Sequence, residues 1–416
     1  MNELLKNIAI DNKEDISQYD AIAGVESFNV VLNSLEELEV AIDAGITMTR
    51  SLEKIFGVTE ELRTDSPLTD REKRLISLAN ELVVGRDYST ETIMAGNESL
   101  VKTLYEIWAA VQSLLNKLIE MFIKGLKEIS ISIKRNDRLL STLKKRFDKQ
   151  NITSYSCEVT SEAQAHAFLI KGDVPVRSAN ELSSVVDGMT DYGRVIKQIH
   201  VSTSEHRRAL IDVLSILGDN INNKLLDEKQ IADDRDYIKA LKELNDAVIN
   251  RFNLDPSGDR DSFGQSIMKS APFLGGGVFI GKEYDDSKTN LGIEVASAVE
   301  YSKLTSSLST KSYVGEIKDV SAQSMLDMLT AAQSLNEVLD TYSFEKDYFK
   351  EVDRVIEEFK NKTKSSPDRP SSTAIRPTSV AGAVKDFGTA ALKSHADGIR
   401  LVNYVIMFCH SGIKSS

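Results

Sequence analysis

The sequence predicts a mainly α-helical protein, an elongated multi-helix bundle with one very long amphipathic helix and a small β-hairpin or short-strand element. Three observations indicate this fold class. The 416 residues include only 7 prolines, and long stretches such as 68–174 contain none of these helix-breaking residues. Apolar residues recur every three or four positions over much of the chain. The hydrophobic share of 41% and the charged share of 27% are those of an ordinary folded protein.

The N-terminal region, 1–66, is predicted to be acidic and helical. It carries 14 acidic and 5 basic side chains. Apolar spacing predicts a helix within 34–57, with Ser34 and Glu37 forming a capping box and Gly57 ending the helix. A second helix is expected just after Pro67.

The longest helical pattern covers 99–150. Its apolar positions are Leu100, Leu104, Ile107, Val111, Leu114, Leu118, Phe122, Leu126, Ile129 and Ile133, at steps of three and four. As one helix, about 50 residues would span roughly 75 Å. Gly125 and the β-branched run 129–133 are the places where a kink is expected.

This same segment is basic, although the chain as a whole has a net charge of -12. Residues 101–150 hold 11 basic and 5 acidic side chains. The candidate contact residues for DNA phosphates or an acidic partner are Lys117, Lys124, Lys127, Lys134, Arg135, Arg138, Lys144, Lys145, Arg146 and Lys149. The alternative is a solvated helix face that pairs with acidic neighbours.

The rest of the chain is predicted to alternate between helices and short strands. One or two strands are expected in 151–179, and a β-hairpin at about 277–298. The predicted organisation is an acidic helical region at 1–66, a basic helical region at 67–150, short strands then helices at 151–260, a Gly-rich hairpin element at 261–310, a helix at 311–362, a linker at 363–378 and a closing amphipathic helix at 379–416.

No catalytic, cofactor-binding or metal-binding residues are predicted. Gly276–Lys282 matches the spacing of a phosphate-binding loop, but Glu283 replaces the Ser or Thr that would hold magnesium. The histidines, His166, His200, His206, His395 and His410, show no metal-ligand spacing. Cys157 and Cys409 are expected to be buried free thiols. A non-enzymatic protein is therefore expected.

The sequence also bears on membranes and on the compartment. Charged residues interrupt the most apolar region, so no constitutive membrane span is expected. The acidic N-terminus does not fit a secretion signal, which predicts synthesis in the cytoplasm. A second hypothesis is an α-helical pore-forming toxin, in which 104–133 would unpack and insert.

The order of these features resembles the internal head proteins of large tailed bacteriophages. In that family an acidic helical region precedes a Trp-containing amphipathic helix that ends in a Lys/Arg-rich run, and here Trp108 and Lys134–Arg146 stand at the matching positions. Pro272–Gly281 and the late helix Leu392–His410 complete the resemblance, which covers most of the chain.

The resemblance implies a virion structural protein, made in the bacterial host cytoplasm and located in the capsid interior. Its implied partners are other virion proteins, packaged DNA close to the basic helix, and further copies of the chain in coiled-coil contacts. No small-molecule substrate and no cofactor are expected. Besides the toxin, a helical scaffold or adaptor protein without a virion role remains an alternative.

Overall fold

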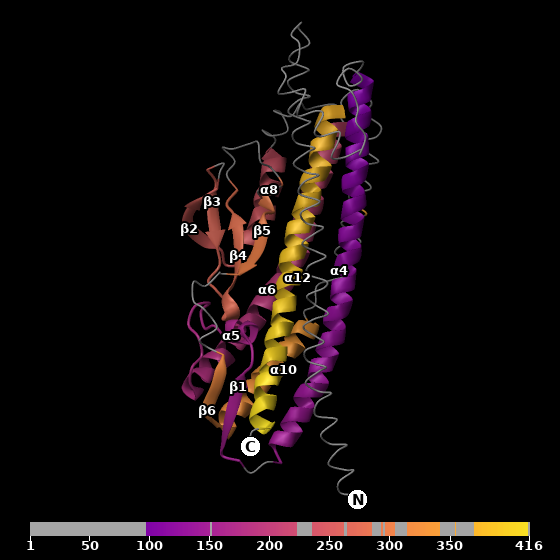
Figure 1. Cartoon of the computed structure of the whole chain (residues 1–416). Coiled ribbons are helices and arrows are strands. Elements are labelled where there is room, and N and C mark those ends of the chain that lie inside the picture. The colour runs from indigo at the N-terminus through magenta and orange to yellow at the C-terminus, as the bar shows by residue number, and fades with distance from the viewer. Residues whose placement is uncertain are drawn as a thin grey trace, which may run out of the picture.

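The computed structural model describes residues 97–149, 152–222, 235–261, 264–284, 296–303, 314–341 and 370–414, with 293 and 354 as single residues. Within these ranges the chain forms six α-helices and two antiparallel sheets that contain six strands (Figure 1). The helices predicted within 1–96 lie outside the described residues.

The predicted fold class, an elongated helical bundle with one very long helix and a small hairpin, is wrong. No single very long helix stands out, because three helices have similar lengths: α4 (Asn97–Phe147, 51 residues), α6 (Leu182–Asn222, 41 residues) and α12 (Pro370–Lys414, 45 residues). The β structure is also larger than one hairpin. The helices are combined with two sheets, so the protein contains substantial α and β parts.

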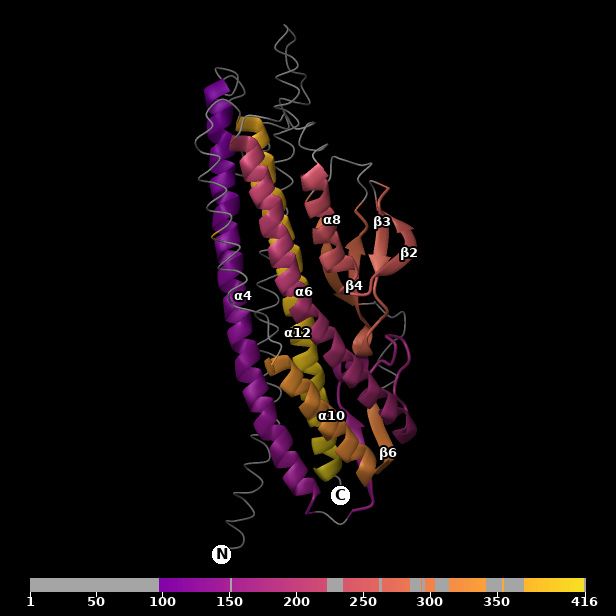
Figure 2. The ribbon, with the colours of Figure 1, turned by 180° about the vertical axis from the view of Figure 1, so that it is seen from behind.

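Helix α12 is the centre of the helical part. It packs against α4 along much of its length, and α10 (Ala322–Thr341) packs against the lower half of α12, α4 and α6 (Figures 1 and 2). Between residues 383 and 410 almost every α12 side chain is buried. A helix that is mostly apolar on all sides must be covered on all sides, and the Ala- and Val-rich sequence of α12 fits this position.

The smaller sheet pairs β1 (Ser154–Val159) with β6 (Gly315–Ser321) in antiparallel fashion. Burial alternates along β1, so that Tyr155, Cys157 and Val159 face the core. Helix α5 (Glu162–Ala167) follows β1 and begins at Ser161, whose hydroxyl accepts a hydrogen bond from the Gln164 N–H. This short helix, which the sequence pattern did not predict, places His166 at the pocket described below.

The larger sheet has the order β2-β3-β4-β5, with every neighbouring pair antiparallel. Its strands are β2 (Asp255–Arg260), β3 (Ser266–Lys269), β4 (Gly277–Lys282) and β5 (Val299–Lys303). It lies beside α8 (Arg235–Ile249) and α12 (Figure 1).

The hairpin expected at about 277–298 is wrong in the position of its second strand. The partner of β4 is β5, which begins at Val299. Before it, the Ser297 N–H donates to the Ile293 carbonyl at 3.0 Å, which is helical bonding, and Ile293 and Ala296 are both buried. Their spacing of three residues suits one face of a helical turn rather than a strand.

The second part of the predicted linker at 363–378 is helical instead, because α12 begins at Pro370, while 363–369 lie outside the described residues. Proline is well tolerated at the first position of a helix, where its missing N–H has no partner within the helix. Pro370 therefore stands where a helix starts, and Pro377 lies within α12.

Candidate functional site

Seven of the ten predicted basic residues form one exposed row along α4 and the turn that follows it. We define the basic row as Lys117, Lys124, Lys127, Lys134, Arg138, Lys145 and Lys149, all of which are exposed. Their spacing continues in steps of three and four through Glu120, Ile131 and Thr142, which are exposed as well. Such spacing keeps side chains on one face of a helix.

The opposite face of α4 explains why the basic row points outward. Phe122, Leu126, Ile129 and Ile133 are at most 5% exposed and belong to the core that α4 shares with α10 and α12. The apolar face therefore fixes the rotation of α4 about its axis and leaves the lysines toward solvent. From Lys117 to Lys145 the row extends about 42 Å at 1.5 Å per residue.

The other three predicted contact residues lie elsewhere on α4. Lys144 faces α10, where its ammonium donates to the side-chain oxygen of Gln333. Arg135 and Arg146 are half-buried. In the part of the chain that the structure describes, no ion pair joins a member of the basic row to a carboxylate.

The segment that matched a phosphate-binding loop is not such a loop. Gly277–Lys282 is strand β4, whose residues pair with β3 and β5. The Lys282 ammonium lies 3.0 Å from the carboxylate of Asp261. A strand in the middle of a sheet uses its N–H groups in the sheet, so they are not arranged to hold phosphate.

Several other residues that could act as nucleophiles, bases or metal ligands are buried in the core. Cys157 and Cys409 are buried free thiols, and burial raises the pKa of Cys157 to about 12. His206 stacks on Phe387 with ring centroids 4.2 Å apart, and burial lowers the pKa of His206 to about 3. Among the described residues no group of His, Cys, Asp and Glu has the arrangement of a metal site.

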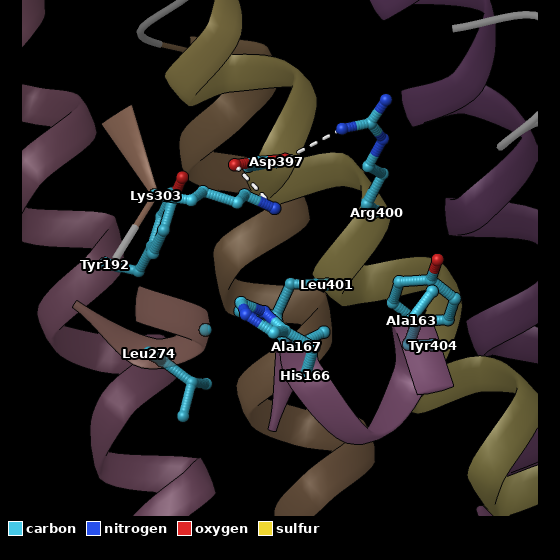
Figure 3. Close-up of a pocket in the computed structure, with 11 residues that line it drawn as sticks. Ala163, His166, Ala167, Tyr192, Leu274, Lys303, Asp397, Arg400, Leu401 and Tyr404 are labelled. Atoms are coloured by element: carbon cyan, nitrogen blue, oxygen red, sulfur yellow. Dashed lines mark hydrogen bonds and ion pairs between the residues drawn. The ribbon is translucent and has the colours of Figure 1, made fainter. Parts of the chain in front are cut away.

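A second site was not predicted from the sequence. A cavity of about 380 Å³ lies between α5, α6, β5 and α12 (Figure 3). We call it the Asp397 pocket, and its polar lining residues are His166, Tyr192, Lys303, Asp397, Arg400 and Tyr404. Its apolar lining includes Leu274 and Leu401.

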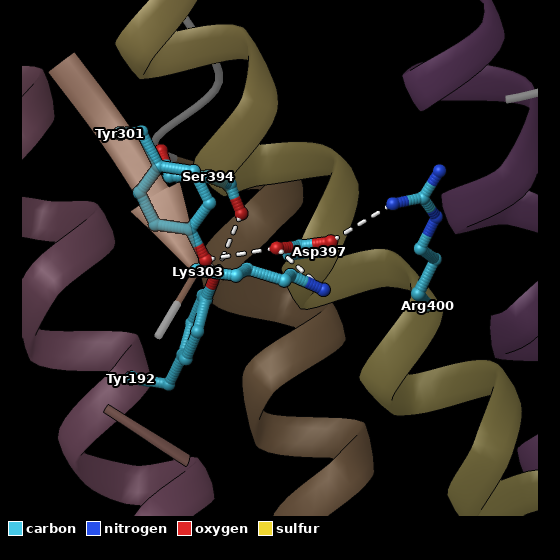
Figure 4. A network of polar contacts seen from close by, with 6 residues as sticks. All are labelled: Tyr192, Tyr301, Lys303, Ser394, Asp397 and Arg400. Carbon is cyan, nitrogen blue, oxygen red and sulfur yellow. Dashed lines mark hydrogen bonds and ion pairs between the residues drawn. The ribbon is translucent and has the colours of Figure 1, made fainter. Parts of the chain in front are cut away.

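Asp397 is the centre of the polar contacts in this pocket (Figure 4). Its Oδ2 lies 3.1 Å from Lys303 Nζ and accepts a hydrogen bond of 2.9 Å from the Tyr301 hydroxyl. Its Oδ1 accepts a hydrogen bond of 3.0 Å from Arg400. The Asp397 side chain is only 10% exposed, so both of its oxygens depend on these donors rather than on water.

Two tyrosines extend the contacts into the core. The Tyr192 hydroxyl donates to the Ser394 carbonyl at 2.8 Å and lies 3.4 Å from the Tyr301 hydroxyl. Burial and the charge of Asp397 raise the pKa of both tyrosines, so both stay neutral donors. Loss of any one group would leave a buried polar partner unsatisfied.

Two cations contact the carboxylate of Asp397 in this pocket, Lys303 and Arg400. His166 responds to this field: burial lowers its pKa, Lys303 lowers it further, and Asp397 partly opposes them. His166 therefore stands in the pocket as a neutral imidazole at pH 7.

No relative of this chain is found. A scan against protein-family models, a search of curated proteins and a search of solved structures each return no match. The resemblance to phage internal head proteins accordingly rests on the order of sequence features alone.

The described residues also include no helix that is both long enough and apolar enough to cross a membrane. Of the apolar face of α4 that the toxin hypothesis would insert into a bilayer, Phe122, Leu126, Ile129 and Ile133 are buried in the core that α4 shares with α10 and α12. The Asp397 pocket had no clear signal in the sequence, because its residues come from 163–167, 192, 274–275, 303 and 397–404. The one local hint is the pair Asp397 and Arg400, three residues apart in a mostly apolar helix.

Proposed function

We propose that this chain is a non-enzymatic structural protein of a tailed bacteriophage particle, packaged in or assembled into the head, with its basic row against the packaged DNA. The observation that carries the proposal is the basic row: seven exposed cations along α4 and the turn that follows it, in a chain whose net charge is -12. The order of sequence features that resembles internal head proteins supports the same assignment.

The chemistry of the basic row favours contact with phosphates rather than with bases. Lysine binds phosphate as a point charge, and such contacts carry affinity without sequence information. The three remaining positions of the row are Glu120, Ile131 and Thr142, so no aromatic side chain is available for stacking on bases. We therefore expect binding that is independent of DNA sequence and sensitive to salt.

The geometry of α4 also limits how many phosphates it can contact. The row is about 42 Å long and follows a helix, whereas one turn of DNA covers about 34 to 36 Å. A straight row along one side of a duplex crosses from one strand to the other and meets only some of the phosphates. Because the rest of the chain is acidic, contact with DNA should be confined to this face.

Mass spectrometry of purified particles from infected cells tests the location. The chain should copurify with the capsid through a density gradient and resist protease added outside the intact particle. Absence from the particles at any detectable copy number would refute the proposal. Protease sensitivity in intact particles would instead place the chain outside the capsid and refute its packaging with DNA.

Formaldehyde cross-linking inside intact particles tests the DNA contact residue by residue. Peptides that contain Lys124, Lys127 and Lys134 should carry nucleotide adducts. Exposed lysines on other elements, Lys171 and Lys318, serve as matched controls and should carry far fewer. Equal adduct yields on both groups would show that proximity to DNA is not specific to the basic row.

A further inference from the structure

We propose that the core between α4 and α10 binds ordered water through three buried polar side chains, Ser132, Asn136 and Asn336. We call these three residues the polar layer. They lie on α10 and on the core side of α4, away from the basic row. This inference therefore goes beyond the proposed structural role and does not depend on it.

One hydrogen bond between α10 and α4 brings the polar layer together. Asn336 Nδ2 donates to the Ile133 carbonyl at 3.0 Å. Ile133 lies between Ser132 and Asn136 on α4, and these two residues are four positions apart, so their side chains share one face of the helix. The three side chains therefore meet within about one helical turn.

The polar layer is enclosed by the core, and several of its atoms have no hydrogen-bond partner. Ser132, Asn136 and Asn336 are 1%, 0% and 2% exposed. Among the residues that the structure describes, no partner is found for the Ser132 hydroxyl, for either polar atom of the Asn136 amide, or for Asn336 Oδ1. Buried polar groups are nearly always bonded to protein or to ordered water, because an unpaired group loses its hydration without replacement. The polar layer therefore needs a further partner.

The same level of the core contains another buried amide on α12. Asn403 is 1% exposed, and its amide likewise has no partner within the described ranges. Gly398, five residues before Asn403, faces Leu339, which is three residues after Asn336, and α10 and α12 run in opposite directions. Asn403 and Asn336 thus differ in height by only about 3 Å at 1.5 Å per residue. Polar side chains at this level therefore come from three helices.

The unpaired atoms of the polar layer are both donors and acceptors, which selects water over an ion. Asn136 offers two N–H donors and an oxygen acceptor, Asn336 offers an oxygen, and Ser132 offers a hydroxyl that can donate and accept. A cation would leave the N–H donors unpaired, and an anion would leave the oxygens unpaired. Neither ion would meet an opposite charge in the polar layer, so its burial would be unfavourable. Water donates and accepts, and buried waters typically have about two to four polar partners.

Nuclear magnetic resonance of the full-length chain with isotope-labelled asparagine tests the proposal. The side-chain NH2 signals of Asn136, assigned by their loss in an Asn136→Leu variant, should show cross-relaxation with long-lived water. The matched control is the buried amide of Asn245, which donates to the carbonyls of Lys282 and Ala296 at 3.0 and 3.3 Å. We expect the water signal of Asn136 to be at least about fivefold stronger than that of Asn245. A signal no stronger than the control's would overturn the proposal.

A Ser132→Ala variant separates bound water from a relayed signal. A hydroxyl proton that exchanges with solvent can give a neighbouring amide the same cross-relaxation as a bound water. The Asn136 signal should persist in Ser132→Ala, because Asn136 and Asn336 still bind the water. Its loss would identify the hydroxyl as the source and would overturn the proposal.

Unfolding equilibria of two variants provide an independent readout. Asn136→Leu removes the amide together with its water, so the equilibrium constant for unfolding should change less than about tenfold. Asn245→Leu leaves the carbonyls of Lys282 and Ala296 without their donor and should raise this constant at least about tenfold. Urea denaturation measures both. Equal increases would mean that Asn136 is bonded directly to protein groups, which contradicts the proposal. None of these outcomes bears on particle incorporation or on the basic row.

Discussion

The basic row and the Asp397 pocket both contain lysine and arginine side chains, but in opposite settings. The row is contiguous in sequence, repeats every three or four residues on one helix, and is exposed along its length. The pocket joins three charged side chains from two elements, β5 and α12, and holds them partly away from water. In the row, water solvates each cation separately, whereas in the pocket each charged group contacts a partner of opposite charge.

This difference determines how each region should respond to substitution. An exposed charge contributes little to folding, since water solvates it as well before folding as after. A buried charge is stabilised by its partners, and removing one partner leaves the others without compensation. Changes in the row should therefore alter binding to DNA and leave stability almost unchanged, while changes in the pocket should lower stability.

The largest expected effect on stability is that of Asp397→Ala. This change leaves Lys303 and Arg400 close together without their carboxylate and removes the acceptor of Tyr301. We expect the free energy of unfolding to fall by about 3 kcal/mol. Urea denaturation followed by circular dichroism measures it, with Glu316→Ala on the exposed face of β6 as control. A loss no larger than the control's would show that the polar network is not structural.

Low pH should reduce the stability of the folded chain through the buried His206. Its pKa is about 3 in the folded chain against 6.5 in the unfolded chain, so below pH 6.5 the unfolded state takes up a proton that the folded state does not. Stability from this residue is thus complete above pH 6.5 and lost as the pH falls. The loss should reach about 3 kcal/mol at pH 4.5.

The matched variant for this prediction is His206→Phe, which keeps an aromatic ring against Phe387. Subtracting its pH profile from that of the wild type removes the contribution of the carboxylates, which both chains share. The difference should grow steadily from pH 6.5 to pH 4.5. Parallel profiles would mean that His206 has the same pKa in the folded chain as in the unfolded chain, which contradicts its burial against Phe387.

Two glycine-to-alanine substitutions compare a position where a Cβ would clash with a position where it has room. A Cβ at Gly277 would overlap the hydroxyl of Tyr301 and lie 2.8 Å from its Cζ, so Gly277→Ala should displace the Tyr301–Asp397 bond and cost about 2 kcal/mol. Gly193 lies within α6, and a Cβ there meets only Val338 at 3.8 Å. Gly193→Ala should therefore stabilise the chain by about 0.5 to 1 kcal/mol. Thermal melts of both variants measure the two changes in stability. If both variants change stability in the same direction, the packing described around Tyr301 is contradicted.

The smallest expected effect on stability is that of charge reversal in the basic row. Changing Lys124, Lys127, Lys134 and Arg138 to Glu should alter the free energy of unfolding by no more than about 0.5 kcal/mol. Urea denaturation at moderate salt measures it. A loss of several kcal/mol would indicate that the row is covered by another part of the chain rather than exposed.

The basic row could be predicted from the sequence because its signal is local. A helix repeats every 3.6 residues, so apolar and basic positions that alternate in steps of three and four define two faces without further information. Lys144 shows the limit of this approach. The list of basic residues placed Lys144 with the row. Because Lys144 lies one position before the row residue Lys145, its side chain is turned around the helix axis toward Gln333 on α10.

The Asp397 pocket and the larger sheet could not be predicted in the same way. Lys303 and Asp397 meet only after β5 packs on α12, and neither has a distinctive neighbour in the sequence. Strand β2 contains Pro256 and Gly258 and is exposed along its length, so it lacks the alternation of buried and exposed residues that marks a strand. As an edge strand it tolerates proline, although proline and glycine in a sequence favour a turn.

The central claim, that the basic row is the surface that contacts DNA, is tested most directly by the salt dependence of duplex binding. The wild-type affinity should fall with a slope of about −3 to −6 in log–log form, since up to seven cations displace counterions. The reversal of Lys124, Lys127, Lys134 and Arg138 to Glu should abolish binding at about 50 mM salt. Reversal of four exposed cations elsewhere, Lys171, Arg194, Lys239 and Lys318, gives the same net charge and should keep the wild-type slope within about one unit. Equal loss of binding in the two fourfold variants would contradict the claim, because total charge and not the row would then govern the contact.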